Sequence, residues 1–195
     1  MPTTDTVGLI LAGGRSRRMQ GQDKALQLLH GEPLLVHAIT RLRPQVDELW
    51  LNSNAPPELF SAYGLAIIPD HLPGFLGPLA GIHAGLLQFP HSYLVTVAVD
   101  LPFLPSDLVT RLRTGLESKA CAYANNGEQH ALALLWRPGM AARVEEYLQR
   151  GGRSLKEFLA DQGQAVRFDQ PQDRGLFCNI NTPEDLARVE RDTPL

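Results

Sequence analysis

The residues between Leu9 and Lys24 combine glycine with clustered positive charge. Gly13 and Gly14 follow an apolar run, and four Arg or Lys residues stand against one acid between Arg15 and Lys24. Because glycine has no Cβ, its backbone amides are open to a ligand. Amides, guanidinium groups and a lysine together hold anionic oxygens well. The segment therefore predicts a binding loop for a polyphosphate.

Each of these features has a simpler explanation when it stands alone. A Gly-Gly pair after a strand is usually a turn, and clustered basic residues are usually a solvated surface. The spacing is also not that of a P-loop, since no Gly-Lys-Ser/Thr follows, and it is not Gly-x-Gly-x-x-Gly. The combination still favours phosphate binding, but not a Walker ATPase or a dinucleotide dehydrogenase.

Asp100 is the second candidate, because it directly follows the apolar run 93–99. An unpaired carboxylate is costly to bury, so we expect it at a strand tip facing a cation; the alternative is a helix cap or turn aspartate. Asn52 and Asp70 likewise come after apolar runs, and could be turn formers. In an open parallel sheet the carboxyl ends of the strands line the ligand crevice. These side chains should therefore converge near the glycine loop.

The elements that would position these residues alternate along the chain. Short apolar runs separated by helical patterns predict βαβ units and a parallel sheet covered on both faces. Around Asn126-Gly127, two strand-like runs predict an antiparallel hairpin at the sheet edge. We therefore expect an α/β fold: one Rossmann-like domain over residues 1–195 with a mostly parallel central sheet flanked by helices. Strands are expected at 7–11, 48–51, 64–68, 93–99, 120–124, 131–136, 165–168 and 176–178, and helices at 33–44, 81–87, 105–116, 140–148, 154–159 and from 182.

Composition limits the class of protein. The chain has 195 residues, a formal net charge of −3 and 44% hydrophobic residues, which is ordinary for a globular domain and argues against a nucleic-acid partner. Two cysteines cannot form a disulfide framework. We see neither a secretion signal nor an apolar run long enough for a membrane span. The expectation is a cytoplasmic protein without a membrane partner.

The loop Leu-Ala-Gly-Gly-x-Ser-x-Arg-Met-x-Gly-x-x-Lys, which runs from Leu11 to Lys24, resembles the signature of the molybdenum cofactor guanylyltransferases. These belong to the nucleotidyltransferases with a nucleotide-diphospho-sugar transferase fold. One departure is Gln20, where the family usually carries glycine, but Arg18 and Lys24 stay in register.

The resemblance implies roles for individual residues. Val-Asp-Leu-Pro-Phe around Asp100 resembles the family's Asp-x-Pro motif, which implies Mg²⁺ on this carboxylate with phosphate oxygens and waters completing the shell. Gly-Pro-Leu-Ala-Gly from Gly77 implies recognition of guanine. Asn179 and Asn181 alternate on an expected strand end and so should point to one face; alternatively Asn181 only begins a turn. Their match to Asn-x-Asn-Thr-Pro-Glu implies that they lie near the metal or the acceptor. His130 is at most a candidate for a pterin contact. The implied nucleotide contacts are Leu11, Ala12, Gly13, Gly14, Lys24, Asn52, Asp70, Gly77, Pro78 and Asp100.

The expected reaction is transfer of GMP from GTP to the terminal phosphate of molybdopterin or its molybdenum-loaded form. Lys24 and Arg18 would stabilise the leaving pyrophosphate, and Asp100 would hold Mg²⁺. Molybdenum-insertion proteins and molybdoenzyme chaperones are the further partners expected. The alternatives are a molybdopterin cytidylyltransferase or sugar-phosphate nucleotidyltransferase on the same fold, and a non-catalytic module that delivers the cofactor.

Overall fold

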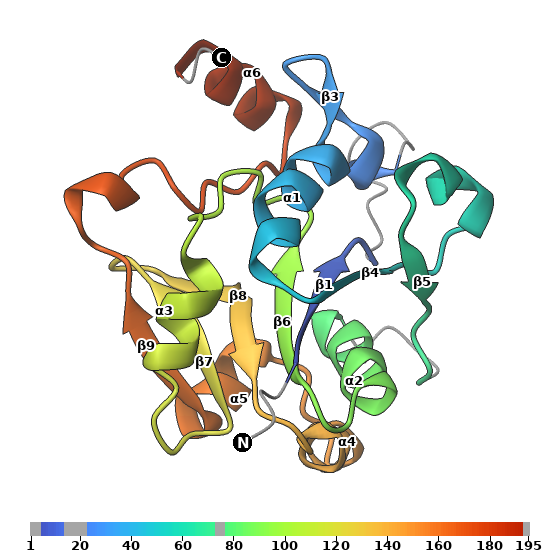
Figure 1. Cartoon of the computed structure of the whole chain (residues 1–195), viewed down its shortest axis with the longest axis vertical. Helices are drawn as coiled ribbons and strands as arrows, with labels where there is room; N and C mark the ends of the chain where they lie inside the picture. The colour runs from blue at the N-terminus through green and yellow to red at the C-terminus, as the bar shows by residue number, and fades with distance from the viewer. Residues whose placement is uncertain (1–4, 14–22, 73–76, 193–195) are drawn as a thin grey trace.

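Seven strands form the central sheet in the order β5-β4-β1-β6-β8-β7-β9 (Figure 1). The computed structural model describes residues 5–13, 23–72 and 77–192. Strands β5, β4, β1 and β6 are parallel; β8 pairs antiparallel with both β6 and β7, and β9 returns parallel to β7. The mostly parallel sheet with an antiparallel excursion is thus confirmed, but the expected position of the hairpin at the sheet edge is wrong, because β8 and β7 lie between β6 and β9. The strands are β1 (Thr6–Leu11), β4 (Glu48–Asn52), β5 (Ala66–Ile68), β6 (Tyr93–Ala98), β7 (Cys121–Asn125), β8 (Gln129–Trp136) and β9 (Gly163–Arg167).

Helices cover both faces of this sheet. Along β1, Ile10 packs into the cluster that contains α1 (Leu34–Leu42) and α3 (Leu108–Thr114), whereas Leu9 and Leu11 pack into the cluster with α2 (Pro78–Gln88), α4 (Ala141–Gln149) and α5 (Leu155–Gln162). Since successive strand side chains point to opposite faces, one apolar strand supplies both cores. The last helix, α6 (Pro183–Asp192), lies beside the small hairpin of β2 (Leu28–Leu29) and β3 (Glu32–Pro33) (Figure 1).

Local capping explains where two of the helices begin. Ser154 Oγ accepts a hydrogen bond from the Glu157 N–H at 3.2 Å and starts α5, as expected. Thr182 Oγ1 accepts from the Asp185 N–H at 3.1 Å, while Asp185 Oδ2 accepts from the Thr182 N–H at 3.1 Å. This reciprocal pair fixes the first turn of α6 directly after Asn181.

Several boundaries differ from the sequence expectation. The expected strand at 176–178 is wrong: Phe177 has a left-handed backbone with φ 61°, and its N–H donates to Phe103 O at 3.0 Å instead of joining a ladder. Helix α2 begins earlier than expected, at Pro78, and α3 is shorter. The 3₁₀ helices η1 (Lys24–Leu26), η2 (Arg43–Gln45), η3 (Pro57–Tyr63) and η4 (Pro171–Asp173) fill connections. Within the described residues, no helix has the length and apolarity needed to cross a bilayer.

Candidate active site

The carboxyl ends of the central parallel strands bring the sequence-predicted residues to one edge. In the register, Leu11 lies opposite Asn52 on one side and Ala98 on the other, and Asn52 lies opposite Ile68. Neighbouring strands are about 5 Å apart. Gly13, Asp70 and Asp100 therefore leave the sheet at the same edge, as expected for a crevice at the strand ends.

Lys24 and Asp100 are in direct contact at this edge although they are far apart in sequence. Lys24 Nζ lies 2.6 Å from Asp100 Oδ2 and also donates to Asn181 Oδ1 at 2.8 Å. Both charged side chains are only 17% exposed. The predicted convergence of Lys24 and Asp100 in one place is thus confirmed; their chemical roles remain a prediction.

The contact with Lys24 uses only one of the two carboxylate oxygens of Asp100. Asp100 Oδ1 is buried, and it has no hydrogen-bond partner among the described residues. The described residues also contain no group of three or more His, Cys, Asp or Glu side chains able to hold a metal. A carboxylate oxygen that has no partner among the described residues fits Mg²⁺, which usually keeps waters and substrate phosphates in its shell.

Asn52 and Asp70 form a polar network at the ends of β4 and β5. Asn52 Nδ2 donates to Ile68 O and to Asp70 Oδ1, both at 3.0 Å. The second carboxylate oxygen of Asp70 accepts from Asn54 Nδ2 at 2.7 Å. Asn52 is only 2% exposed, and its hydrogen bond to Ile68 O joins the ends of β4 and β5 beneath the surface. Whether either residue also contacts the nucleotide stays a prediction.

Two glycines make room for the Asn52 side chain. A β-carbon at Gly81 would lie 2.1 Å from Asn52 Oδ1, and one at Gly13 would lie 3.1 Å from the same atom. The first glycine is in α2 and the second follows β1. Asn52 therefore packs closely against both Gly81 and Gly13, and this packing requirement was not visible in the sequence.

Helix α2 begins just after Gly77. Gly77 precedes it with a left-handed φ of 64°, which glycine adopts without strain, and Pro78 occupies the first helical position. Both residues are exposed. The partial positive charge of a helix N-terminus favours anions, and Gly81 in the first turns of this helix packs against Asn52 at the strand edge.

The remaining predicted residues are only partly accounted for. Gly14 and Arg18 lie outside the described residues, as does the loop 73–76 before Gly77. Asn179 is exposed in an irregular segment, so the expectation that it alternates with Asn181 on a strand is wrong. Of this pair, Asn181 reaches the site through its hydrogen bond with Lys24.

An aromatic stack that the sequence did not reveal lies beyond β6. The His130 ring stacks on Phe177 with 4.6 Å between centroids, and His130 Nε2 lies 2.7 Å from Asn126 Oδ1. Burial lowers the pKa of His130 from its ordinary value, despite the opposing charge of Glu128. A neutral, flat surface of this kind can support a planar ring. A role in pterin binding remains a prediction.

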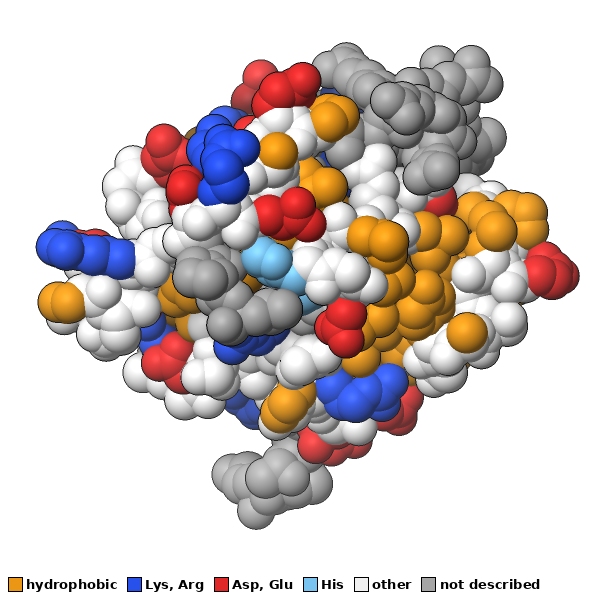
Figure 2. Space-filling view, turned by 90° about the horizontal axis from the view of Figure 1, so that it is seen from above, with side chains coloured by type: hydrophobic (Ala, Val, Ile, Leu, Met, Phe, Trp, Pro, Cys, Tyr) orange, Lys and Arg blue, Asp and Glu red, His pale blue; other side chains and the backbone are white. Residues whose placement is uncertain are grey.

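Charge on the surface seen from above is mixed. Figure 2 shows acidic and basic side chains interspersed on this face, beside a hydrophobic patch on the right of the view. Among the described residues, the large hydrophobic side chains that are exposed are Leu28, Leu59 and Leu87. Among the described residues at the strand edge, Lys24 supplies positive charge.

A parallel-strand edge that joins glycine backbone, a helix N-terminus and a lysine–carboxylate pair defines a nucleotide-binding α/β protein. The family model for the MobA-like NTP transferase domain matches residues 8–166. The chain belongs to this family and is a nucleotidyltransferase, which confirms the resemblance found in its glycine loop.

Individual proteins of known name and structure are similar to this chain over most of its length. The molybdenum cofactor guanylyltransferases of Yersinia pseudotuberculosis (serotype O:1b) and Yersinia pestis (strain Pestoides F) are each 43% identical over 186 residues, covering 94% of both chains. Among solved structures, molybdopterin-guanine dinucleotide biosynthesis protein A from Archaeoglobus fulgidus superposes with a TM-score of 0.77 at 25% identity, over 95% of this chain and 97% of the other. A nucleotidyl transferase from Methanothermobacter has a TM-score of 0.71 at 18% identity, covering 97% and 98%, and shares the fold.

Proposed function

We propose that this protein transfers GMP from GTP to the terminal phosphate of molybdopterin or molybdenum-loaded molybdopterin. The observation that carries the proposal is the 43% identity, over 94% of the chain, to proteins named molybdenum cofactor guanylyltransferase. An oxygen of the acceptor phosphate forms a bond to the α-phosphorus of GTP. The bond from that phosphorus to the β-phosphate oxygen breaks, and pyrophosphate leaves with the electron pair.

The chain's own groups suit this reaction. The acceptor phosphate is already ionised near neutral pH, so no side chain need remove a proton from it. What the reaction needs is alignment of the two phosphates and neutralisation of their charge. Lys24, the amides near Gly13 and the N-terminus of α2 supply positive charge at one edge, with Lys24 nearest the leaving pyrophosphate; Arg18 is proposed to act with it.

Asp100 is the residue proposed to hold Mg²⁺, through the buried oxygen that has no partner among the described residues. When bound, the ion would withdraw charge from the phosphate oxygens. Asp100 Oδ2 meanwhile keeps Lys24 Nζ at the edge, and Asn181 Oδ1 holds the same ammonium group from the other side. Asn181 is thus proposed as a positioning residue for Lys24.

Two further points belong to the same proposal. We place the reaction in the cytoplasm, because GTP is available there. The product is a cofactor, so the proposal includes its transfer to molybdenum-insertion proteins or molybdoenzyme chaperones.

A nucleotide competition assay tests the reaction. With molybdopterin and Mg²⁺ present, pyrophosphate release should be fastest with GTP among GTP, CTP, UTP and ATP, and mass spectrometry should detect molybdopterin guanine dinucleotide. Faster release with CTP would contradict the guanylyl assignment. Bound GTP that stays intact in the presence of acceptor would instead favour a delivery module.

Variants test the residues. Lys24→Gln and Asp100→Asn should each lower kcat by roughly 10²–10³-fold, as when a preorganised charge contact is lost. Lys119→Gln is the matched control, because Lys119 is exposed and donates to Asp161 O at 3.0 Å, away from the strand edge. Near wild-type rates for Lys24→Gln would show that this lysine has no part in the chemistry.

A further inference from the structure

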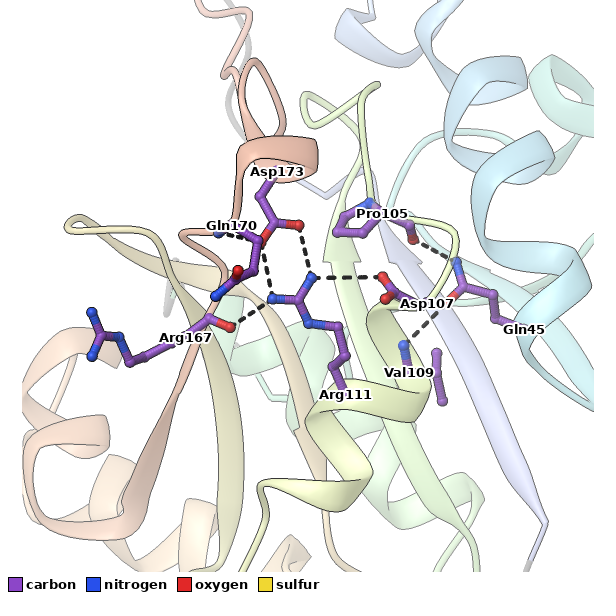
Figure 3. Close-up of polar contacts among 8 residues, drawn as sticks. All are labelled: Gln45, Pro105, Asp107, Val109, Arg111, Arg167, Gln170 and Asp173. Carbon is purple, nitrogen blue, oxygen red and sulfur yellow. Dashed lines mark hydrogen bonds and ion pairs between the residues drawn. The ribbon is translucent and has the colours of Figure 1, made fainter.

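An ion pair between Arg111 and Asp173, away from the strand edge, connects α3 to the segment that leads to Asn181. Arg111, on α3, donates from Nη1 to Asp173 Oδ1 at 2.7 Å and from Nη2 to Asp173 Oδ2 at 3.0 Å (Figure 3). Arg111 Nη2 also donates to Arg167 O at 2.7 Å. Two parallel bonds to one carboxylate give a fixed geometry that a lysine could not reproduce. We call residues 168–181 the C-terminal strap.

Arg111 and Asp173 are both largely buried in this contact. The Asp173 side chain is 2% exposed and that of Arg111 20%. The guanidinium also lies over the Phe168 ring, 3.7 Å from its centroid. Its hydrogen bonds lower the pKa of Asp173, and the same bonds raise the pKa of Arg111. Both groups therefore stay charged over the physiological range.

From this anchor the strap runs directly to the site. The Phe177 N–H donates to Phe103 O at 3.0 Å, and the Ile180 N–H donates to Asp100 O at 3.0 Å. One residue further on, Asn181 Oδ1 accepts from Lys24 Nζ. The strap thus contacts the backbone of Asp100 and the side chain of Lys24. Among the described residues, the ion pair of Asp173 with Arg111 is the only one that joins the strap to another helix.

The helix that carries Arg111 is itself held in place. Gln45 Nε2 donates to Pro105 O at 2.9 Å, and Gln45 Oε1 accepts from the Val109 N–H at 3.0 Å (Figure 3). Pro105 is in the loop after Asp100, and Val109 is in the first turn of α3. Gln45 therefore fixes α3 relative to the loop on which the strap rests.

We propose that Arg111 and Asp173 are a positioning pair for nucleotidyl transfer: they hold the C-terminal strap so that Ile180 fixes the Asp100 backbone and Asn181 fixes Lys24. This rests on the proposed function. Arg111 and Asp173 act through the strap and have no contact with Lys24 or the Asp100 carboxylate among the contacts described. The simpler alternative is that the pair only stabilises the fold, although buried ion pairs are weak evidence for stability.

Hydrogen exchange tests the mechanical part without using activity. The variants are Arg111→Lys, which keeps the charge but not the paired bonds, and Asp173→Asn, which keeps the shape. We expect the amides of Phe177 and Ile180 to exchange about tenfold faster relative to the amides of β1, the effect of losing about one hydrogen bond to a charged group. Acceleration of all amides together, or none, would show that the pair does not hold the strap.

A control variant separates this effect from general damage to α3. Arg113 lies on the same helix, and its guanidinium is 4.3 Å from the Tyr93 ring centroid while Nη1 donates to Thr6 Oγ1 at 2.9 Å. Arg113→Lys should alter thermal stability comparably but leave the relative exchange of Ile180 unchanged. Equal acceleration of Ile180 in both variants would overturn the assignment.

Kinetics tests the catalytic part. Arg111→Lys should lower kcat about tenfold and leave KM for GTP within about twofold, since one charge-assisted contact is loosened while the glycine loop is intact. In an Asn181→Ala background the same change should lower kcat by less than it does in the wild-type background, because Lys24 is already released and only the contact of Ile180 with the Asp100 backbone remains to be loosened. Additive losses would refute the coupling. Failure of the wild-type protein to transfer GMP would instead refute the proposed function, and hydrogen exchange would still decide whether the strap is held.

Discussion

Replacing Gly81 with alanine sets two physical effects against each other. Gly81 lies inside α2, where alanine normally stabilises a helix by about 1 kcal/mol relative to glycine. Yet the new β-carbon would lie 2.1 Å from Asn52 Oδ1, 2.6 Å from Cγ and 3.0 Å from Nδ2. Asn52 is 2% exposed and donates hydrogen bonds to Ile68 O and Asp70 Oδ1, so its side chain cannot move aside without losing them. Gly81→Ala should therefore destabilise the protein.

The size of the effect follows from those contacts. To restore ordinary contact, the Asn52 amide must move by roughly 1 Å, which breaks both of its hydrogen bonds. Leaving a buried polar group unsatisfied costs about 1–3 kcal/mol, and two bonds are affected. After the gain in helix propensity, the net loss in the free energy of unfolding is about 2 kcal/mol. For a chain of 195 residues that lowers Tm by about 4–8 °C.

Thermal and urea unfolding of four proteins test this reasoning: wild type, Gly81→Ala, Asn52→Ala and the double variant. In the Asn52→Ala background the obstructing atoms are gone, so Gly81→Ala should become stabilising by about 1 kcal/mol. The sign of the Gly81→Ala effect should thus depend on Asn52. A higher Tm for Gly81→Ala in the wild-type background would refute the claim that the Asn52 side chain leaves no room for a β-carbon at Gly81.

Three further predictions concern stability. Burial lowers the pKa of His83 from 6.5, so below pH 6.5 the unfolded chain binds the proton more readily and the free energy of unfolding falls; His83→Leu should flatten that fall when urea unfolding is compared at pH 7.5 and 5.5. The Arg111 hydrogen bond lowers the pKa of Asp173 from 3.8, which gives stability that is present above pH 3.8 and lost as pH falls through the lower folded value, so Asp173→Asn should weaken the acid dependence below about pH 4. Ser154→Ala removes the cap of α5 and should cost about 1 kcal/mol in urea unfolding, whereas a loss under 0.3 kcal/mol would contradict the cap.

The order of the elements and the meeting of Lys24 with Asp100 could be predicted because their signals are local. Apolar runs followed by glycine, Asn or Asp mark strand ends, and the topology of a parallel sheet collects those ends at one edge. Asp100 could therefore be placed near Gly13 without any information on side-chain contacts. The 2.6 Å contact with Lys24 agrees with that argument.

The segment around Phe177 shows where local reasoning fails. Leu176, Phe177 and Cys178 have the apolar pattern of a strand, but the Phe177 backbone is left-handed and its N–H donates to Phe103 O. The aromatic ring is buried against Phe168 and under His130. A run of apolar residues reports burial, and here burial is satisfied by a strap across the strand ends rather than by a ladder.

The residues that support the site depend on partners that the sequence separates widely. Gly81 is a small residue because Asn52, from another strand, occupies the space where a side chain would be. Asp173 is charged and buried because Arg111 meets it from a helix 62 positions earlier. Neither the small residue at position 81 nor the buried charge at position 173 follows a periodic pattern or a motif spacing in the sequence, since each is set by the packing of one element on another. The residues proposed to bind the substrate lie at or near strand ends and are visible in the sequence pattern, whereas the residues that support them become recognisable only when the elements are assembled.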